Sequence, residues 1–385
     1  MELDKQRNDL RMIQSKGKIQ GLKAFAKFVC GVLGFTQLCF ASAANPNVSD
    51  TGYEIISATV MPSLYWVDNN RLLFAGIKTA NMQTAIAAKE ADRVERLKKL
   101  YVWDNATKSV RFYADAKGAC IANGVIHYTV KVDKAAGKTI VREGPFGFEK
   151  EIEKPLPSTK ELSTQGQMLR MHSIFTCKTH LRSGLIPSPP TDRNVVVLRE
   201  GDGYLDLGPN VGSDLAKRRA TPRNLTLYKA VSVSAITLPM TWEENFSQFD
   251  IVYSAYRGAY VLQPKMPRGS PIGIGRPWPK DEPLLVYLLW ADGRTQTFSI
   301  PHWPAEYLGH PRPMKMGWIF GGGKSPKSVA LYFFDGTSVA KVQPGFVREI
   351  AVSPDGCKAA VGINNKPYEM GTPISLKVFE FCVGR

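Results

Sequence analysis

Residues 346–363 read FVREIAVSPDGCKAAVGI. Apolar residues on both sides of the Ser-Pro-Asp-Gly sequence at 353–356 predict a strand, a tight turn and a second strand. Residues 64–77 (LYWVDNNRLLFAGI), near the other end of the chain, follow the same plan, with Asp-Asn-Asn at 68–70 as the turn. The same local unit at both ends of the chain predicts an all-β fold built from repeats.

Weaker versions of this unit occur between the two segments. They lie in residues 100–113, 195–207, 284–300 and 329–342, each with an Asp-containing turn, and more faintly in 139–148 around Gly144-Pro145. Turns that recur at intervals of roughly 40 to 50 residues, with four strands in each interval, are typical of β-propellers. The length of the chain allows about six or seven such blades.

The Ser-Pro-Asp-Gly form resembles the turn between the first and second strands of WD40-like (TolB-type) β-propeller repeats. The resemblance implies a single β-propeller of four-stranded blades and brings no catalytic motif with it. It also implies that the last blade, whose third strand is Ile374–Cys382, borrows its outer strand from the opposite terminus. Tyr53–Val60 (YEIISATV) precedes the first blade, and we expect it to close the ring and protect that open edge.

Proline-rich segments leave a second architecture open, either a pair of β-sandwiches or two stacked all-β domains. Residues 155–160, 187–193 and 264–283 are candidate linkers for such a split. We interpret them instead as loops on one face of a single propeller domain that covers residues 44–385. Residues 81–99 (NMQTAIAAKEADRVERLKK) have helical spacing and predict a helical insertion in the first blade, which is either a partner-binding helix or a solvated excursion.

The first 43 residues resemble a signal peptide. A basic stretch is followed by the apolar run 28–40 (FVCGVLGFTQLCF) and by Ala-Ser-Ala at 41–43, which is the order of an export signal. The apolar run is shorter than the roughly 20 residues of a membrane-spanning helix, although a membrane anchor or a buried helix remains an alternative. We therefore expect an exported protein, periplasmic or secreted.

The composition indicates a folded protein, and the net positive charge needs an explanation. The hydrophobic share of 44% and the charged share of 22% argue against a disordered chain, a collagen-like repeat or a polytopic membrane protein. The formal net charge of +16 invites a nucleic-acid function, but export argues against one and part of this charge belongs to the signal. We expect no nucleic-acid partner and at most a weak attraction to anionic envelope surfaces.

Four cysteines remain after removal of the signal, and an even number in an exported protein favours disulfides. Cys357 and Cys382 lie at the start of one predicted strand and the end of the next, so we expect them to pair. Cys120 and Cys177 are then the second pair by exclusion, while four buried free thiols remain an alternative. No metal site is expected, because the cysteines and histidines lack zinc-ligand spacing.

Known catalytic and cofactor motifs fail on spacing. The Gly-Gly-Gly-Lys-Ser sequence at 321–325 lacks the upstream glycine of a phosphate-binding loop and predicts a strand turn instead. Gly273-Ile274-Gly275 lacks the third glycine of a dinucleotide fingerprint, and no Gly-x-Ser-x-Gly elbow occurs. No cofactor is expected, and no catalytic residue can be assigned among the five histidines.

Two clusters are candidate binding sites. Long, proline-bounded loops that carry Trp and Arg are typical of a binding face held by a rigid scaffold. One candidate is the basic cluster in a predicted loop before residue 225, and the other is the stretch around 268–312. Their residues are Lys217, Arg218 and Arg219 in the first, and Arg276, Trp278, His302 and Trp303 in the second.

The sequence therefore favours an exported, non-catalytic binding or scaffold protein that holds a protein or glycan through loops on one face. The alternative is a secreted or periplasmic hydrolase or lyase that cleaves glycans or peptides at the central channel. A periplasmic partner in envelope assembly is a third possibility. Residues that line the channel would distinguish these functions, since fold alone does not set function.

Overall fold

The computed structural model describes most strands of the chain and the turns between them. The described residues are 46–55, 64–87, 99–115, 119–122, 124–156, 186, 193–198, 202–209, 225–229, 232–236, 248–265, 283–301, 308–323, 325–365 and 374–382. Residues 1–45, which contain the predicted export signal, lie outside this set. Among the described residues, no helix has the length and apolarity needed to cross a membrane.

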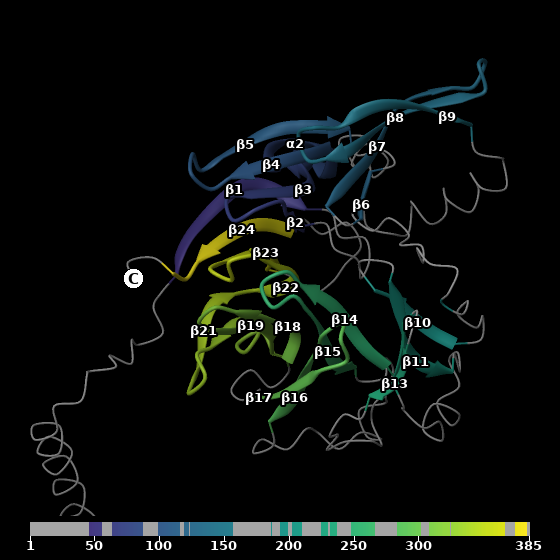
Figure 1. Ribbon diagram of the computed structural model, residues 1–385. Coiled ribbons are helices and arrows are strands. Elements are labelled where there is room, and N and C mark those ends of the chain that lie inside the picture. Colours follow the sequence, from purple (N-terminus) through teal and green to yellow (C-terminus); the bar gives the residue numbers. More distant parts are fainter. Residues whose placement is uncertain are drawn as a thin grey trace, which may run out of the picture. The chain divides into compact units, whose positions relative to one another are not determined.

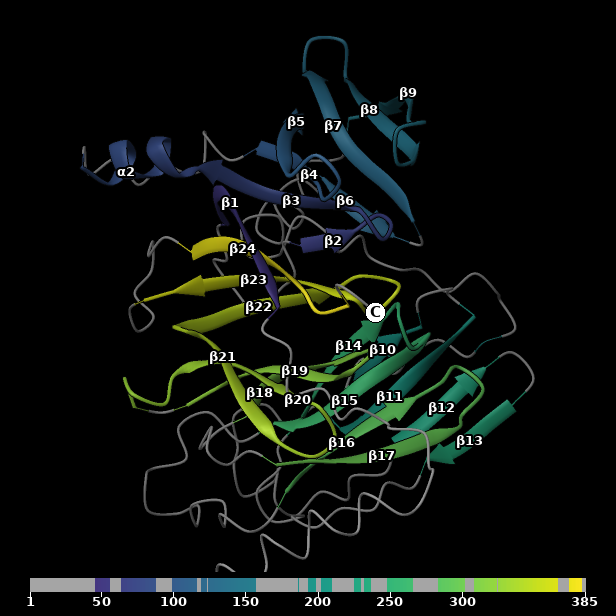
Figure 2. The same ribbon diagram turned by 90° about the vertical axis from the view of Figure 1, so that its left-hand side faces the viewer.

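The described strands form six antiparallel units of four strands, and the predicted all-β propeller class is confirmed (Figures 1 and 2). In five units, each strand pairs with the next one along the chain. The first blade consists of β2(Leu64–Trp66), β3(Arg71–Lys78), β4(Lys99–Asp104) and β5(Ser109–Asp115), and the second of β6(Cys120–Ala122), β7(Val125–Asp133), β8(Lys138–Pro145) and β9(Lys150–Pro155). The third consists of β10(Arg193–Val197), β11(Gly203–Pro209), β12(Leu225–Lys229) and β13(Ser232–Ile236), and the fourth of β14(Gln248–Ser254), β15(Ala259–Lys265), β16(Leu284–Leu289) and β17(Thr295–Ile300). The fifth consists of β18(Leu308–Met314), β19(Gly317–Gly322), β20(Ala330–Phe334) and β21(Val339–Pro344). We number them blades 1 to 5 in this order.

The sixth blade joins the two ends of the chain. It consists of β22(Phe346–Val352), β23(Lys358–Asn364), β24(Ile374–Glu380) and the N-terminal strand β1(Asn47–Ile55). β1 pairs antiparallel with β24 along its length and with β3 of blade 1 at its end, so that blades 6 and 1 share one sheet. In Figure 1 the purple β1 lies between the yellow β24 and β3. The predicted closure by an N-terminal strand is therefore confirmed.

The bounds of the closing strand differ from the prediction. Strand β1 begins at Asn47 instead of Tyr53 and ends at Ile55, while residues 56–60 lie outside the described set. The missed part, residues 47–52, reads NVSDTG and is mostly exposed, with only Thr51 buried. It is a strand because its backbone completes the ladder of β24, for which no apolar pattern is needed.

Neighbouring blades are held together by apolar side chains on the facing sides of their sheets. Five buried clusters span the junctions of blades 1 and 2, 3 and 4, 4 and 5, 5 and 6, and 6 and 1. Between blades 2 and 3 the chain passes through residues 157–192, of which the structure describes only Ile186. Inner strands such as β3, β20 and β23 are buried along nearly their whole length, as expected for sheets packed on both faces.

The predicted hairpins are confirmed, but they occupy two different positions in the blade. Residues 64–77 and 346–363 join first and second strands, as predicted, and so does 195–207. Residues 100–113, 284–300 and 329–342 join third and fourth strands. The faint copy in residues 139–148 is wrong in the place of its turn, because Gly144 and Pro145 end strand β8 and the turn to β9 follows at residues 146–149.

The predicted helical insertion is confirmed in its place but not in its bounds. Helix α2(Thr79–Ala87) follows β3 directly and lies between two strands of blade 1. Residues 88–98 lie outside the described set. Met82 is buried, so at least one side chain of the helix packs against the protein and does not point into solvent.

Candidate functional site

The two ends of the blades differ in their connections. Because the strands of each blade run antiparallel in sequence order, the turns from first to second strand and from third to fourth strand leave from one end, which we call the turn end. The connections from second to third strand and from blade to blade leave from the other, which we call the loop end. The longest connections, at residues 56–63, 79–98, 156–192, 210–224, 237–247, 266–283 and 365–373, all join strands at the loop end.

Every predicted binding residue falls in a loop-end connection. Lys217, Arg218 and Arg219 belong to the segment between β11 and β12, and Arg276 and Trp278 to the segment between β15 and β16. Both segments lie outside the described residues, and so do the side chains of His302 and Trp303 between β17 and β18. The proposed sites therefore stay predictions, but their flanking strands direct all three segments to the same end of the blades.

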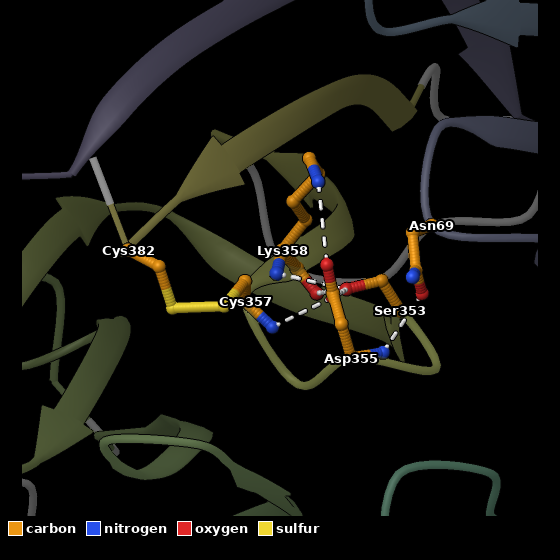
Figure 3. Close-up of a disulfide and its surroundings, with 6 residues drawn as sticks. All are labelled: Asn69, Ser353, Asp355, Cys357, Lys358 and Cys382. Atoms are coloured by element: carbon orange, nitrogen blue, oxygen red, sulfur yellow. Dashed lines mark hydrogen bonds and ion pairs between the residues drawn. A yellow bond between two sulfur atoms is a disulfide. The ribbon is translucent and has the colours of Figure 1, made fainter. Parts of the chain in front are cut away.

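At the turn end, turns from different blades contact one another near the SPDG sequence of blade 6. Asn69 Oδ1 in blade 1 accepts a hydrogen bond from the Asp355 N–H at 2.9 Å (Figure 3). The Gly356 carbonyl accepts one from the Lys315 N–H of blade 5, also at 2.9 Å. A Cβ added to Gly356 would lie 2.7 Å from Cδ2 of Tyr256, so the ring of this blade 4 residue packs against the glycine. Three first-to-second-strand turns thus converge on the SPDG turn.

Hydrogen bonds fix the shape of the SPDG turn itself. Ser353 Oγ donates to Asp355 Oδ1 at 2.5 Å, and the Cys357 N–H donates to the same oxygen at 3.0 Å (Figure 3). Burial alone would raise the pKa of Asp355, but these two donors and the nearby Lys358 ammonium together lower it. The carboxylate is therefore committed to its own turn and is no candidate for acid–base chemistry.

The predicted disulfide between Cys357 and Cys382 is present (Figure 3). Their Cα atoms lie 5.2 Å apart, because Cys357 precedes β23 and Cys382 follows β24, two strands that pair antiparallel. The bond ties the turn end of blade 6 to the last residues of the chain. Cys177 lies outside the described residues, so its predicted pairing with Cys120 stays a prediction.

Aromatic rings and arginines gather in the turns of blade 4. The Trp290 indole N–H donates to the Arg257 carbonyl at 3.2 Å and so joins the two turns of this blade. The Arg294 guanidinium lies over the Trp290 ring, with Cζ 5.2 Å from its centroid. The Arg257 guanidinium lies over the Tyr256 ring in the same way, at 5.1 Å. No local sequence pattern indicates this cluster, because its members come from two turns.

The described histidines and carboxylates show structural functions. His127 Nδ1 lies 3.1 Å from Glu143 Oε2, and Lys154 Nζ lies 2.6 Å from the same oxygen. This trio joins neighbouring strands of blade 2, and the hydrogen bond from Lys154 is the largest influence that lowers the pKa of Glu143. His310 lies in β18, and the other three histidines lie outside the described set.

Charged residues of the first strands, which would line a central channel, are also engaged in the fold. Glu349 Oε1 in β22 accepts the Leu64 N–H of β2 at 2.9 Å, and Arg193 in β10 pairs with the buried Asp206 in β11. Within the part of the chain that the structure describes, no three His, Cys, Asp or Glu side chains form a group that could hold a metal ion.

The glycines at 321–323 belong to a strand turn, as predicted. β19 ends at Gly322 and β20 begins at Ala330, and the Val329 N–H donates to the Ser325 carbonyl at 2.9 Å. A phosphate-binding loop would instead be followed by a helix, and the described residues that follow form a strand.

Comparisons with known proteins give likeness of fold only. No family model and no curated protein matches the chain. Similar solved structures include an acylaminoacyl peptidase of Pyrococcus horikoshii, with 11% identity, a TM-score of 0.40 and coverage of 81% of this chain and 51% of the peptidase. They also include the propeller domain of the Pyrococcus furiosus trilobed protease, with 10% identity, a TM-score of 0.26 and coverage of 79% and 80%.

A third similar structure is virginiamycin B lyase from Staphylococcus aureus, with 10% identity, a TM-score of 0.29 and coverage of 87% of this chain and 99% of the lyase. The chain spans about half the length of the peptidase. At such identities and scores the activities of these enzymes give no argument about this chain, since fold does not imply function.

Proposed function

We propose that the protein is an exported, non-catalytic binding module that holds a protein or glycan partner through the loop end of its blades. The observation that supports this proposal is the direction of the strands, which sends every long connection to that end. Binding residues are commonly carried by loops on a rigid scaffold, and the blades supply such a scaffold through their buried junctions.

The loop-end connections contain residue types that commonly bind protein or glycan partners. Trp278 and Trp303 supply large rings that can stack on a sugar or a peptide, and Arg276 supplies a planar cation. Lys217, Arg218 and Arg219 add a basic segment that would favour an anionic partner or envelope surface. Recognition by several connections at once would explain why one end carries them all.

The test is cross-linking of the exported protein to its partner in intact envelopes, followed by mass spectrometry. The proposal expects cross-links to residues 210–224, 266–282 and 301–307, and loss of the complex in the double variant Trp278→Ala/Trp303→Ala. Arg294→Gln, at the turn end, serves as the matched control and should keep the complex. Cross-links confined to the turn end would contradict the proposal, and so would turnover of a glycan or peptide panel by the purified protein, which would instead favour a hydrolase or lyase.

A further inference from the structure

Three arginines at the turn end share one arrangement, in which the guanidinium lies over an aromatic ring. Arg71 Cζ lies 5.1 Å from the centroid of Phe146, Arg294 lies over Trp290, and Arg257 lies over Tyr256. A guanidinium on a ring face is held in place and partly shielded from water, and its edge remains available for two parallel hydrogen bonds to a carboxylate.

Two of the three arginines have that carboxylate in their own turn. Arg71 Nε donates to Asp68 Oδ2 at 2.6 Å, and Arg294 Nε donates to Asp292 Oδ2 at 2.6 Å. The hydrogen bond from Arg294 is the largest influence on Asp292 and lowers its pKa. The arrangement of ring, guanidinium and carboxylate is therefore complete in these two places.

Arg257 lacks the third part. Its guanidinium is exposed and forms no hydrogen bond or ion pair with any residue that the structure describes. The reason lies three residues upstream, where Ser254 takes the place that Asp68 has before Arg71. Ser254 Oγ accepts the Arg257 N–H at 3.3 Å, as Asp68 Oδ1 accepts the Arg71 N–H at 2.7 Å, but a hydroxyl brings no negative charge.

We propose that Arg257, held on the ring of Tyr256, binds a carboxylate of an acidic segment in a partner protein. Lys315 is also exposed, and its backbone lies next to the Gly356 turn on which Tyr256 packs. The nearby carboxylates of Asp292 and Asp355 are already engaged, by Arg294 and by donors of the SPDG turn. Tyr256 and Trp290 give the surface the Trp, Tyr and Arg content of energetically important protein contacts. This surface is separate from the proposed loop-end site, so either can fail alone.

A protein carboxylate fits this place better than a membrane or a polyanionic glycan. Both comparison sites at Arg71 and Arg294 hold a single aspartate carboxylate, and the turn supplies one guanidinium beside a ring instead of a broad basic field.

Binding of a fluorescein-labelled poly-glutamate peptide, followed by fluorescence anisotropy at low ionic strength, tests the proposal. Arg257→Gln should weaken binding about fivefold, the size expected of an exposed but stacked ion pair. Arg71→Gln and Arg294→Gln serve as matched controls, and each should leave the affinity within about twofold, because these arginines already hold a carboxylate.

Ser254→Asp gives a second variant that keeps Arg257. The new carboxylate should pair with the Arg257 guanidinium as Asp68 pairs with Arg71. It should therefore weaken peptide binding as much as Arg257→Gln does. Ser254→Asn, of similar size but neutral, should bind like the unaltered protein. Circular dichroism and the thermal midpoint confirm that each variant is folded.

Three results would overturn the proposal. One is unchanged affinity in Arg257→Gln, and another is an equal loss in all three arginine variants, which would indicate only general attraction to a basic protein. The last is Arg257-dependent binding of heparin fragments or of anionic phospholipid vesicles without binding of the peptide, which would make the ligand a polyanion or a lipid surface.

Discussion

Glu54 and Ser375 are 321 positions apart in the chain and lie side by side in one sheet, with Ser375 Oγ donating a hydrogen bond to Glu54 Oε1 at 3.3 Å. Glu54 also lies in register with Ile77 of β3. One residue of the N-terminal strand thus contacts β24, the third strand of blade 6, and β3, the second strand of blade 1. The two ends of the chain hold the propeller together at this point.

Truncation of Ile55 tests how much this closure stabilises the fold. Its side chain is 0% exposed and packs in the cluster between blades 6 and 1. Ile55→Ala should lower the free energy of unfolding by about 3 kcal/mol, the usual loss for a large buried aliphatic side chain. Urea unfolding measures the change, and Val48→Ala, at a position 48% exposed on the same strand, should change it by less than about 0.5 kcal/mol. Equal effects of the two variants would mean that β1 does not pack as described.

The carboxyl group of Glu54 should make closure depend on pH. Glu54 is 5% exposed, its Oε2 has no hydrogen-bond partner among the described residues, and its Oε1 accepts hydrogen bonds from Thr79 and Ser375. Burial raises the pKa of Glu54, the two hydroxyl groups counteract this in part, and the nearby Asp50 adds to the rise. The folded protein therefore holds this proton more tightly than the unfolded chain does.

The sign of the pH effect follows from linkage. The contribution of Glu54 to stability is fully present below its unfolded pKa, near about 4.3, and is lost as the pH rises through the higher folded pKa. Glu54→Gln removes this loss, so its stability relative to the unaltered protein should increase as the pH rises from acid to neutral. Urea unfolding of both proteins at several pH values measures the difference. A difference that stays constant, or that falls with pH, contradicts a buried Glu54 with a raised pKa.

The Cys357–Cys382 bond should contribute mainly through the unfolded chain. It closes a segment with a sequence separation of 25 residues at the end of blade 6, where the Phe381 N–H also donates to the Cys357 carbonyl at 2.9 Å. Replacing both cysteines by serine should lower the free energy of unfolding by about 3 kcal/mol. Adding a reductant to the unaltered protein should cause a similar loss, and no loss in either experiment would contradict the assignment.

Alanine substitutions at two glycines of the turn end distinguish the cost of backbone strain from the cost of lost packing. Gly356 has φ +72° and Gly336 has φ +97°, so alanine is unfavourable at both. An added Cβ would lie 2.7 Å from the Tyr256 ring and 2.8 Å from the Lys315 nitrogen at Gly356, whereas at Gly336 it would meet nothing within 4 Å.

Gly336→Ala should therefore cost about 1 kcal/mol and Gly356→Ala about 2 kcal/mol more, because only the second disturbs the contact between turns. Chemical denaturation of both variants gives the comparison. Equal losses would mean that the turns of blades 4, 5 and 6 do not converge on Gly356.

The sequence predicted those parts of the fold that depend on local chemistry. Asp-Gly and Asp-Asn-Asn sequences mark tight turns wherever they occur, so the hairpins of blades 1, 4, 5 and 6 were found from their residues alone. The pairing of Cys357 with Cys382 followed from the strand order. The position of each hairpin within its blade could not be predicted, because aspartate turns occur both between first and second strands and between third and fourth strands.

Features that depend on distant residues could not be found in the same way. The exposed start of β1 at Asn47 has no apolar pattern, because its partner β24 determines that it is a strand. The Arg257 surface needs Tyr256, Trp290 and Gly356, which lie in three different turns. One signal was available, since Arg71 and Arg294 each follow closely after an aspartate turn, whereas Arg257 follows Ser254.

Pairing of the N-terminal strand with β24 closes the propeller, and hydrogen exchange tests this closure most directly. Mass spectrometry of the native protein can follow peptides that cover residues 47–55, with β24 and β23 as internal references. Amides of β1 that donate to β24 should exchange as slowly as those of β23 and β24, because all three strands open only when blade 6 unfolds. Exchange of residues 47–55 at the rate of an unstructured peptide, while β23 and β24 stay protected, would contradict the claim.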